Sequence, residues 1–372
     1  MKENSNKKIK TEKHSMLGNP ARFTAVVAFL ILLLLAALVM NVNIGSVSIS
    51  PKHIFEMIIK AISCGISDLI SGADSLAQFV GSSTESQILF KIRMPRMLLA
   101  AVLGGALSVS GYLLQVFFRN PIAGPFVLGI SSGAKMVVGI TLIFLVRYLD
   151  NISAVTLIIS AFAGSLLITG IVLLFSQRMH SMSMLLVIGI MVGYICGAVT
   201  DFSITFANDH DVVNLTNWSM GSFSGANWEF VTLGVFICIP AVLAAMLLSK
   251  PIGAYLLGEG YAQSMGIHIK PFRVILILIS SLLSACVTAL AGPISFVGIA
   301  VPHITKTLLK SSKPAFVLPC SFLCGAVFCV FCDLTARTVF APTELAIGTV
   351  TSFFGAPVVI YMMLKRRRAQ ED

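Results

Sequence analysis

Charged residues are scarce in this sequence. Asp, Glu, Lys and Arg make up 11% of its 372 residues, whereas apolar residues make up 56% and the mean hydropathy is +0.93. Soluble globular domains carry roughly 25% charged residues. This scarcity of charge excludes a soluble globular protein and indicates an integral membrane protein.

The sequence also lacks the motifs of the common enzyme classes. H-E-x-x-H and G-x-S-x-G do not occur, and the six histidines are scattered along the chain. GISSGAKM at 129–136 is superficially like a phosphate-binding loop, but its Lys does not directly follow the second Gly, and Met stands where Ser or Thr would bind magnesium. We therefore predict neither a catalytic nor a nucleotide-binding site, and no cofactor or metal bound directly by this chain.

The eight cysteines do not have the pattern of a disulfide scaffold. Seven lie within apolar segments, and Cys64 alone lies in a predicted outer loop. Four share one segment and spread over about half of a helix circumference, which favours small buried hydrophobic residues over a metal site. These four are Cys320, Cys324, Cys329 and Cys332. For MHSMSM at 179–184, ordinary packing at the end of a span is likewise favoured over a copper or haem ligand role.

What the sequence does contain is a succession of long apolar segments bounded by polar residues, Gly or Pro. Each is of a length suited to crossing ~30 Å of hydrocarbon. The runs are continuous rather than alternating, which favours helices over a β-barrel. We expect an all-α protein with about ten transmembrane helices, near residues 23–40, 94–118, 122–146, 152–175, 182–206, 229–249, 272–291, 294–309, 315–335 and 344–364.

Lys and Arg residues predict the orientation, because short cytoplasmic loops collect them. Both ends of the chain are basic, which agrees with an even number of spans and two cytoplasmic tails, 1–22 and 365–372. The transmembrane domain is then 23–364, with a long outer loop at 41–92 and a cytoplasmic loop at 250–271. The net charge of +10 is a signal of topology and does not indicate nucleic-acid binding.

Two predicted helix pairs are separated by Pro and Gly at membrane depth, in RNPIAGP at 119–125 and AGP at 291–293. Irregular backbone at such depth occurs where it is buried in protein or lines a wet cavity. Small residues such as Gly104, Gly105 and Gly111 permit close helix approach in the second span. Together these features favour a transporter, although packing alone accounts for any single one of them.

Several longer segments follow one another along the chain from about 93 to 364. The segments are RMPR at 93–96, SGYLLQ at 110–115, RNPIAGPFVLGISSGA at 119–134, LGEGYAQSMGI at 257–267, AGPISFVGIAVPHI at 291–304, the series Gly325, Ala326, Asp333 and Arg337, and TELAIGTVTSFFGAPVVIYMML at 343–364. In this order and with these separations they resemble the FecCD family, the membrane permeases of ABC importers for iron-siderophores, haem and cobalamin.

This resemblance implies the type II ABC importer permease fold in the bacterial cytoplasmic membrane. The expected partners are a second copy or a sister permease, a cytoplasmic ATPase dimer carrying ATP and Mg, an extracytoplasmic binding protein, and membrane lipid. The chain itself would be a transport subunit without ATPase activity. The alternatives are a permease for another metal or chelate and, less favoured, an ion-coupled secondary transporter, for which mid-span acidic residues are too few.

The resemblance also gives the arginines at the outer ends of the spans a role. Arg93, Arg96 and Arg337 would receive acidic side chains of the binding protein. The alternative is that Arg93 and Arg96 only cap or snorkel at the top of their span, and that Arg337 only pairs with Asp333.

On the inner side, the loop around LLGEGYAQSMGIHI resembles the coupling helices that contact the ATPase. Gly258, Glu259, Ala262 and Gly266 match the family pattern, with the glycines allowing tight turns and Ala262 allowing close contact. The alternative is an ordinary polar loop.

Three polar residues are candidates for the translocation pathway. Lys135 either lines the pathway or snorkels near the inner surface. Gln115 and Asn120 either line the pathway or satisfy broken backbone. In the outer loop, ISPKHIFEMIIKAI at 49–62 predicts a short surface helix, and SGADSLAQFVGSSTES at 71–86 is expected to be flexible.

Overall fold

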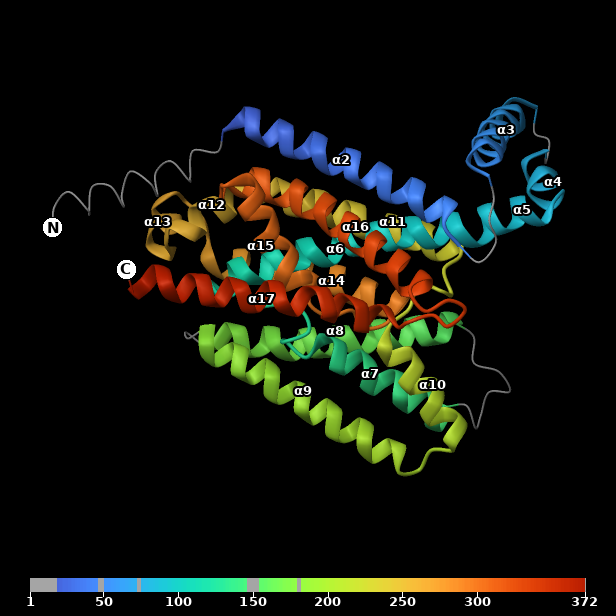
Figure 1. Ribbon diagram of the computed structural model, residues 1–372. Coiled ribbons are helices and arrows are strands. Elements are labelled where there is room, and N and C mark those ends of the chain that lie inside the picture. Colours follow the sequence, from blue (N-terminus) through green and yellow to red (C-terminus); the bar gives the residue numbers. More distant parts are fainter. Residues whose placement is uncertain (1–18, 46–49, 72–74, 146–153, 179–181, 372) are drawn as a thin grey trace.

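The chain forms a bundle of helices whose long members run roughly along one direction (Figure 1). The computed structural model describes residues 19–45, 50–71, 75–145, 154–178 and 182–371. Within these ranges, eight helices are long and apolar enough to cross a membrane, and two shorter apolar helices, Ile130–Leu145 and Val297–Leu309, complete the ten predicted spans. The expectation of an all-helical, multi-pass membrane protein is confirmed.

Along the chain the helices are α2 (Pro20–Asn43), α3 (Pro51–Ser71), α4 (Ser75–Gly81), α5 (Thr84–Gln87), η1 (Ile88–Arg93), α6 (Met94–Phe118), α7 (Ile130–Ile140), η2 (Thr141–Leu145), α8 (Ala154–Arg178), α9 (Met182–Ile204), α10 (Asp209–Met220), α11 (Trp228–Leu247), α12 (Ser249–Leu257), α13 (Glu259–Ser264), α14 (Ile269–Ala291), α15 (Val297–Leu309), α16 (Pro314–Thr338) and α17 (Ile347–Glu371).

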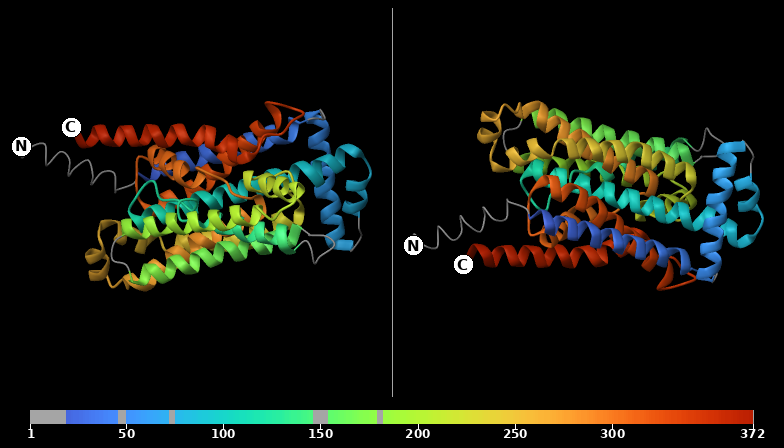
Figure 2. Two further views of the ribbon diagram at one scale, coloured as in Figure 1. Left: turned by 90° about the horizontal axis from the view of Figure 1, so that it is seen from below. Right: turned by 90° about the horizontal axis from the view of Figure 1, so that it is seen from above.

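The two ends of the bundle differ. Helix α2 begins and α17 ends at the same end of the bundle, beside α12 and α13, and we call this the terminal end (Figures 1 and 2). Helices α3, α4 and α5 cover the other end, the α3 end. The predicted basic tail 1–22 lies outside the described residues except for 19–22, and the predicted tail at 365–372 continues α17 as a helix up to Glu371.

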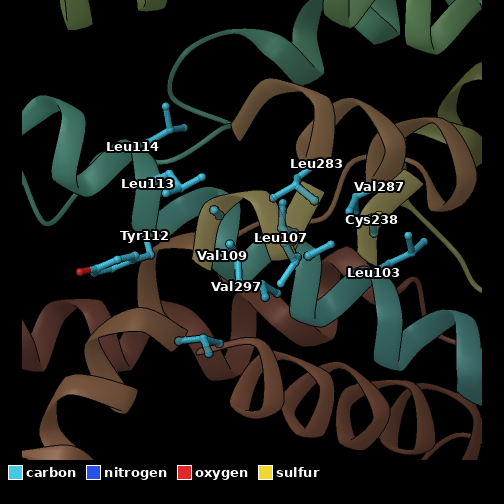
Figure 3. Close-up of a cluster of buried hydrophobic side chains, with 14 of the residues drawn as sticks. Leu103, Leu107, Val109, Tyr112, Leu113, Leu114, Cys238, Leu283, Val287 and Val297 are labelled. Carbon is cyan, nitrogen blue, oxygen red and sulfur yellow. The ribbon is translucent and has the colours of Figure 1, made fainter. Parts of the chain in front are cut away.

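Helix α6 is the centre of the core. Every residue from 103 to 118 is buried, because α6 packs against α11, α14, α15 and α16. Figure 3 shows Leu103, Leu107 and Leu113 of α6 among apolar side chains of α11, α14 and α15. The four cysteines of α16 are also buried in this core, in the role of small apolar side chains.

Glycines make this packing possible by bringing helix backbones together. A Cβ atom added to Gly111 would lie 1.8 Å from the carbonyl oxygen of Gly298 in α15, and one added to Gly104 would lie 2.5 Å from the carbonyl oxygen of Gly325 in α16. No side chain fits at either contact. The small residues predicted from the second span therefore allow α15 and α16 to approach α6 closely.

The third and eighth spans are shorter than predicted. Residues 121–129 form turns, so the helix expected over 122–146 begins only at Ile130. The eighth begins at Val297 rather than 294, because Gly292 and Phe296 have positive φ angles of 73° and 64°. Pro and Gly residues thus make both helices begin farther inside the bundle than the hydropathy pattern predicted.

The outer loop is more helical than predicted. The expected surface helix is present as α3 and extends to Ser71. The following segment was expected to be flexible, yet it contains α4 and α5, because Phe79 and Val80 pack on a small core with Leu89 and Phe90. Helix α10 was also not predicted, since its sequence is too polar for a span.

Candidate functional site

The three predicted docking arginines come together at the α3 end. Arg93 ends η1, Arg96 lies in the first turn of α6 and Arg337 lies in the last turn of α16. They line one cavity of about 250 Å³, together with Glu344. The structure thus gathers cations that are more than 200 positions apart in the sequence.

Arg96 is the most completely paired of the three. Its Nε donates to both carboxylate oxygens of Asp333, at 3.0 and 3.1 Å, and its Nη1 donates to both oxygens of Glu344, each at 3.0 Å. Both Arg96 and Asp333 are buried, whereas the Glu344 side chain is 44% exposed. Asp333 thus neutralises the charge of the guanidinium on its buried side, and Glu344 contacts the guanidinium on the side that faces solvent.

Arg93 and Arg337 are held by backbone and amide oxygens. Arg93 donates to the carbonyl of Val42, and Arg337 Nη2 donates to Asn41 Oδ1 at 2.6 Å and to the Asn41 carbonyl. Asn41 in turn donates to the carbonyl of Val330 at 3.0 Å. Both cations thereby tie the end of α2 to the bundle.

These contacts bear on the alternatives left open by the sequence. Asp333 forms its ion pair with Arg96, whereas Arg337 makes its hydrogen bonds to Asn41. Arg93 and Arg96 are buried, so they do not snorkel as freely exposed side chains. Whether the cavity receives an acidic partner stays a prediction.

The loop at the terminal end consists of α12 and α13 joined by a sharp turn. Gly258 and Gly266 have φ angles of +134° and +81°, which L-residues with a side chain rarely adopt, and they flank α13 on both sides. The predicted tight turns at these two glycines are present in the structure. The loop is helical, and its role as a coupling element that contacts an ATPase stays a prediction.

Glu259 lies between two arginines from other elements. Its Oε1 accepts a hydrogen bond from Arg273 of α14, lies 3.8 Å from Arg119 Nη2 and accepts from the Tyr255 hydroxyl at 3.3 Å. Burial raises the pKa of Tyr255, so this hydroxyl keeps its proton and acts as a donor. The carboxylate fixes the start of α13 against the end of α6 and the start of α14.

The remaining side chains of α13 divide into two faces. Ala262 is completely buried and faces the chain itself, where a larger side chain would push α13 outward. Tyr261 and Met265 are exposed by 49% and 63%. These two side chains lie on the outer side of the loop.

Two of the three pathway candidates have structural partners. Gln115 Nε2 donates to the carbonyl of Ile299 at 3.1 Å, which satisfies the irregular start of α15. Asn120 Oδ1 accepts from the backbone N–H of Ile122 at 3.1 Å, inside the turn that follows α6. Both residues satisfy broken backbone, which was one of the two alternatives.

Lys135 lies in the second turn of α7 and is half-buried. Helix α7 starts beside Gly189 and Gly193 of α9 and runs from there toward the α3 end (Figure 1). Both alternatives for Lys135, a place on the pathway wall and snorkelling near the inner surface, stay predictions.

Sequence reasoning missed several residues of both sites, namely Asn41, Glu344, Arg119, Tyr255 and Arg273. For the charged residues among them, the sequence does contain a signal. The chain has 16 carboxylates for 26 Lys and Arg residues, so each carboxylate close to a span end is a candidate partner for a buried cation. Which cation each carboxylate contacts depends on how the helices pack.

The fold defines a multi-pass membrane protein with a charged site at each end of its helix bundle. The chain belongs to the FecCD transport family, which it matches over residues 32–365. The proteins similar to it are named as permeases of import and transport systems, and a similar solved structure is described as an ABC transporter.

Relatives with named functions are similar over most of their length. The vitamin B12 import system permease protein BtuC of Vibrio vulnificus is 37% identical over 77% of this chain and 86% of its own. The hemin transport system permease protein HmuU of Yersinia pestis is 33% identical over 75% of this chain and 84% of its own. A solved structure described as an inward-facing conformation of a metal-chelate type ABC transporter has a TM-score of 0.77 and 26% identity, and covers 92% of this chain and 99% of that chain.

Proposed function

We propose that this chain is the permease subunit of an ATP-driven importer that carries an iron chelate, haem or a cobalamin-like compound across the bacterial cytoplasmic membrane. The observation that carries the proposal is the family match over residues 32–365, with relatives named for vitamin B12 and haemin. The absence of a nucleotide motif in the sequence agrees with a division of labour in which ATP and Mg are held by a separate ATPase dimer.

The terminal end would face the cytoplasm and the α3 end the outside. The basic residues at both ends of the sequence support this orientation. In this orientation α13 would meet the ATPase and the arginine cavity would meet an extracytoplasmic binding protein. A second copy of the chain, or a sister permease, would complete the pathway.

The proposal is tested by purifying the tagged chain in mild detergent from its own host and identifying co-purified proteins by mass spectrometry. An ATPase subunit in equal proportion is expected, and a captured binding protein or sister permease would indicate the ligand. A chain that is purified alone and still catalyses uptake in vesicles without ATP would contradict the proposal in favour of secondary transport.

Arg337→Glu is expected to weaken docking of the binding protein by at least about tenfold, since a buried charge pair at an interface contributes ~2 kcal/mol or more. Arg337 is the choice because Arg96 already holds two carboxylates of its own chain. The dissociation constant is measured with the permease in nanodiscs and the purified binding protein.

The matched control for this docking test is Lys52→Glu, which makes the same change of charge. Lys52 is exposed on α3, at the same end of the molecule but outside the arginine cavity. We expect the control to slow association only slightly. Equal weakening in both variants would mean that only the general charge of this end matters.

Glu259→Arg is expected to abolish coupled transport, because it would place three cations around the start of α13 where one carboxylate now holds Arg119 and Arg273. ATP-dependent uptake in proteoliposomes measures the effect. Glu229→Arg makes the same charge change at the start of α11, at the α3 end, and is expected to leave ATPase coupling intact. If Glu259→Arg preserved both ATPase assembly and uptake, a specific role for Glu259 would be refuted.

A further inference from the structure

A second cavity, at the terminal end, contains cations without carboxylates. It has a volume of about 490 Å³ and lies between the end of α6, the later turns of α15 and the later part of α17. The residues that line it are Gln115, Pro121, His303, Lys306, Ser312, Met362 and Lys365. Neither predicted end site includes this cavity.

Lys306 is its central group. The side chain is half-buried, and its Nζ donates to Gln115 Oε1 at 3.3 Å and lies 5.0 Å from the centre of the Tyr112 ring. Gln115 is itself fixed by its hydrogen bonds to the start of α15. The ammonium group is therefore held in one place at the cavity wall by neutral groups.

The electrostatic environment of Lys306 differs from that of Arg96 and Arg273. Arg96 has two carboxylates, and Arg273 has Glu259. Within the described part of the chain, Lys306 and Lys365 form no ion pair, and both act electrostatically on His303. Holding a cation in a partly desolvated place without a counter-charge costs free energy.

The donors around the cavity suit a tetrahedral oxyanion. Two ammonium groups supply charge, and the His303 ring and the Ser312 hydroxyl add neutral hydrogen-bonding groups. The apolar span of α17 ends at Lys365, so the cavity lies at the level where a membrane-spanning helix leaves the hydrocarbon. Basic pockets at such a boundary bind phosphate head groups of anionic lipids.

We propose that this cavity is a binding site for a phosphate-class oxyanion, with Lys306 as its fixed inner ligand and Lys365 as its outer one. The anion is either the head group of an anionic phospholipid or free phosphate, which share this chemistry. Occupancy compensates the half-buried ammonium of Lys306 and holds the later part of α17 to α15. The site does not depend on the proposed transport function.

The test uses the full chain, purified in detergent and stripped of lipid. Its thermal unfolding is measured at constant ionic strength with inorganic phosphate, with phosphatidylglycerol and with zwitterionic phosphatidylcholine. The variant is Lys306→Gln/Lys365→Gln. The matched control is Lys310→Gln/Lys313→Gln, which removes the same charge from exposed lysines of the same end that do not line the cavity.

Stabilisation of the wild type and of the control by phosphatidylglycerol or by phosphate is expected. The affinity in the Lys306→Gln/Lys365→Gln variant should be at least about tenfold weaker, because two charge-assisted contacts are lost. Stabilisation by phosphatidylglycerol alone assigns the site to a lipid head group, and stabilisation by phosphate as well assigns it to the free anion. Either result supports the proposal.

No stabilisation of the wild type by either anion, or the same stabilisation in the variant, would overturn it. If the double variant does not fold, Lys365→Gln alone keeps the proposal testable. Lys365 is exposed at the rim, so its loss should lower the affinity for the anion without disturbing the core. An unchanged affinity in Lys365→Gln would equally overturn the proposal.

Discussion

Replacing Gly111 by valine is expected to prevent the chain from folding. A Cβ atom at this position would lie 1.8 Å from the carbonyl oxygen of Gly298 and 2.4 Å from its Cα, so α6 and α15 would have to separate. Overpacking a core costs about 1–3 kcal/mol where side chains can adjust, and here the obstacle is backbone, so we expect more than ~3 kcal/mol. The yield of monodisperse protein in size-exclusion chromatography measures the effect.

The control for this prediction is Gly197→Val in α9. Gly197 is also a glycine of a membrane-spanning helix, and a Cβ atom there would meet nothing within 4 Å. We expect this variant to be recovered at close to the wild-type yield. Equal losses for Gly111→Val and Gly197→Val would show that valine itself, and not the contact between α6 and α15, is responsible.

Arg96→Met should cause the second large effect, since it leaves the carboxylate of Asp333 buried without its ion-pair partner. Asp333 is 1% exposed, and removing one member of a buried pair costs on the order of 3–5 kcal/mol. We expect a marked fall in the melting temperature of the purified chain. Glu344 is half-exposed and can be solvated, so it adds little to this loss.

The double variant Arg96→Met/Asp333→Leu separates stability from docking. Replacing both members of a buried pair by apolar residues is often neutral or stabilising, so most of the lost stability should return. If Arg96 also receives an acidic side chain of a binding protein, this stable variant should still dock poorly. A double variant as unstable as Arg96→Met would contradict the ion pair as the cause, and normal docking by a stable double variant would refute the docking role of Arg96.

The sequence predicted the helices well and their partners poorly. The span at 94–118 coincides with α6, because a long apolar run is sufficient to define a membrane helix. The span at 122–146 was too long, since hydropathy does not distinguish a helix from apolar turns such as 121–129 that are buried between other helices. Length and hydropathy are local properties, whereas the protection of irregular backbone comes from neighbours far along the chain.

For the candidate sites, too, the sequence indicated residues but not their contacts. The family pattern indicated Arg93, Arg96 and Arg337, and the structure brings them together at one cavity. The sequence did not indicate that Arg96 would pair with Asp333, which is 237 positions away. No motif in the sequence singles out Lys306, and its lack of a carboxylate partner is visible only in the folded chain.

The sequence by itself determined the class of the protein, the number of its spans, and the residue types at their ends. Each of these follows from the free energy of placing one segment in hydrocarbon, which depends on that segment alone. Only the tertiary structure decided which charges are neutralised within the chain, at Arg96 and Glu259, and which are left to face a cavity, at Lys306. These depend on how closely helices such as α6 and α15 approach, and the close approach of these two helices requires glycine at position 111.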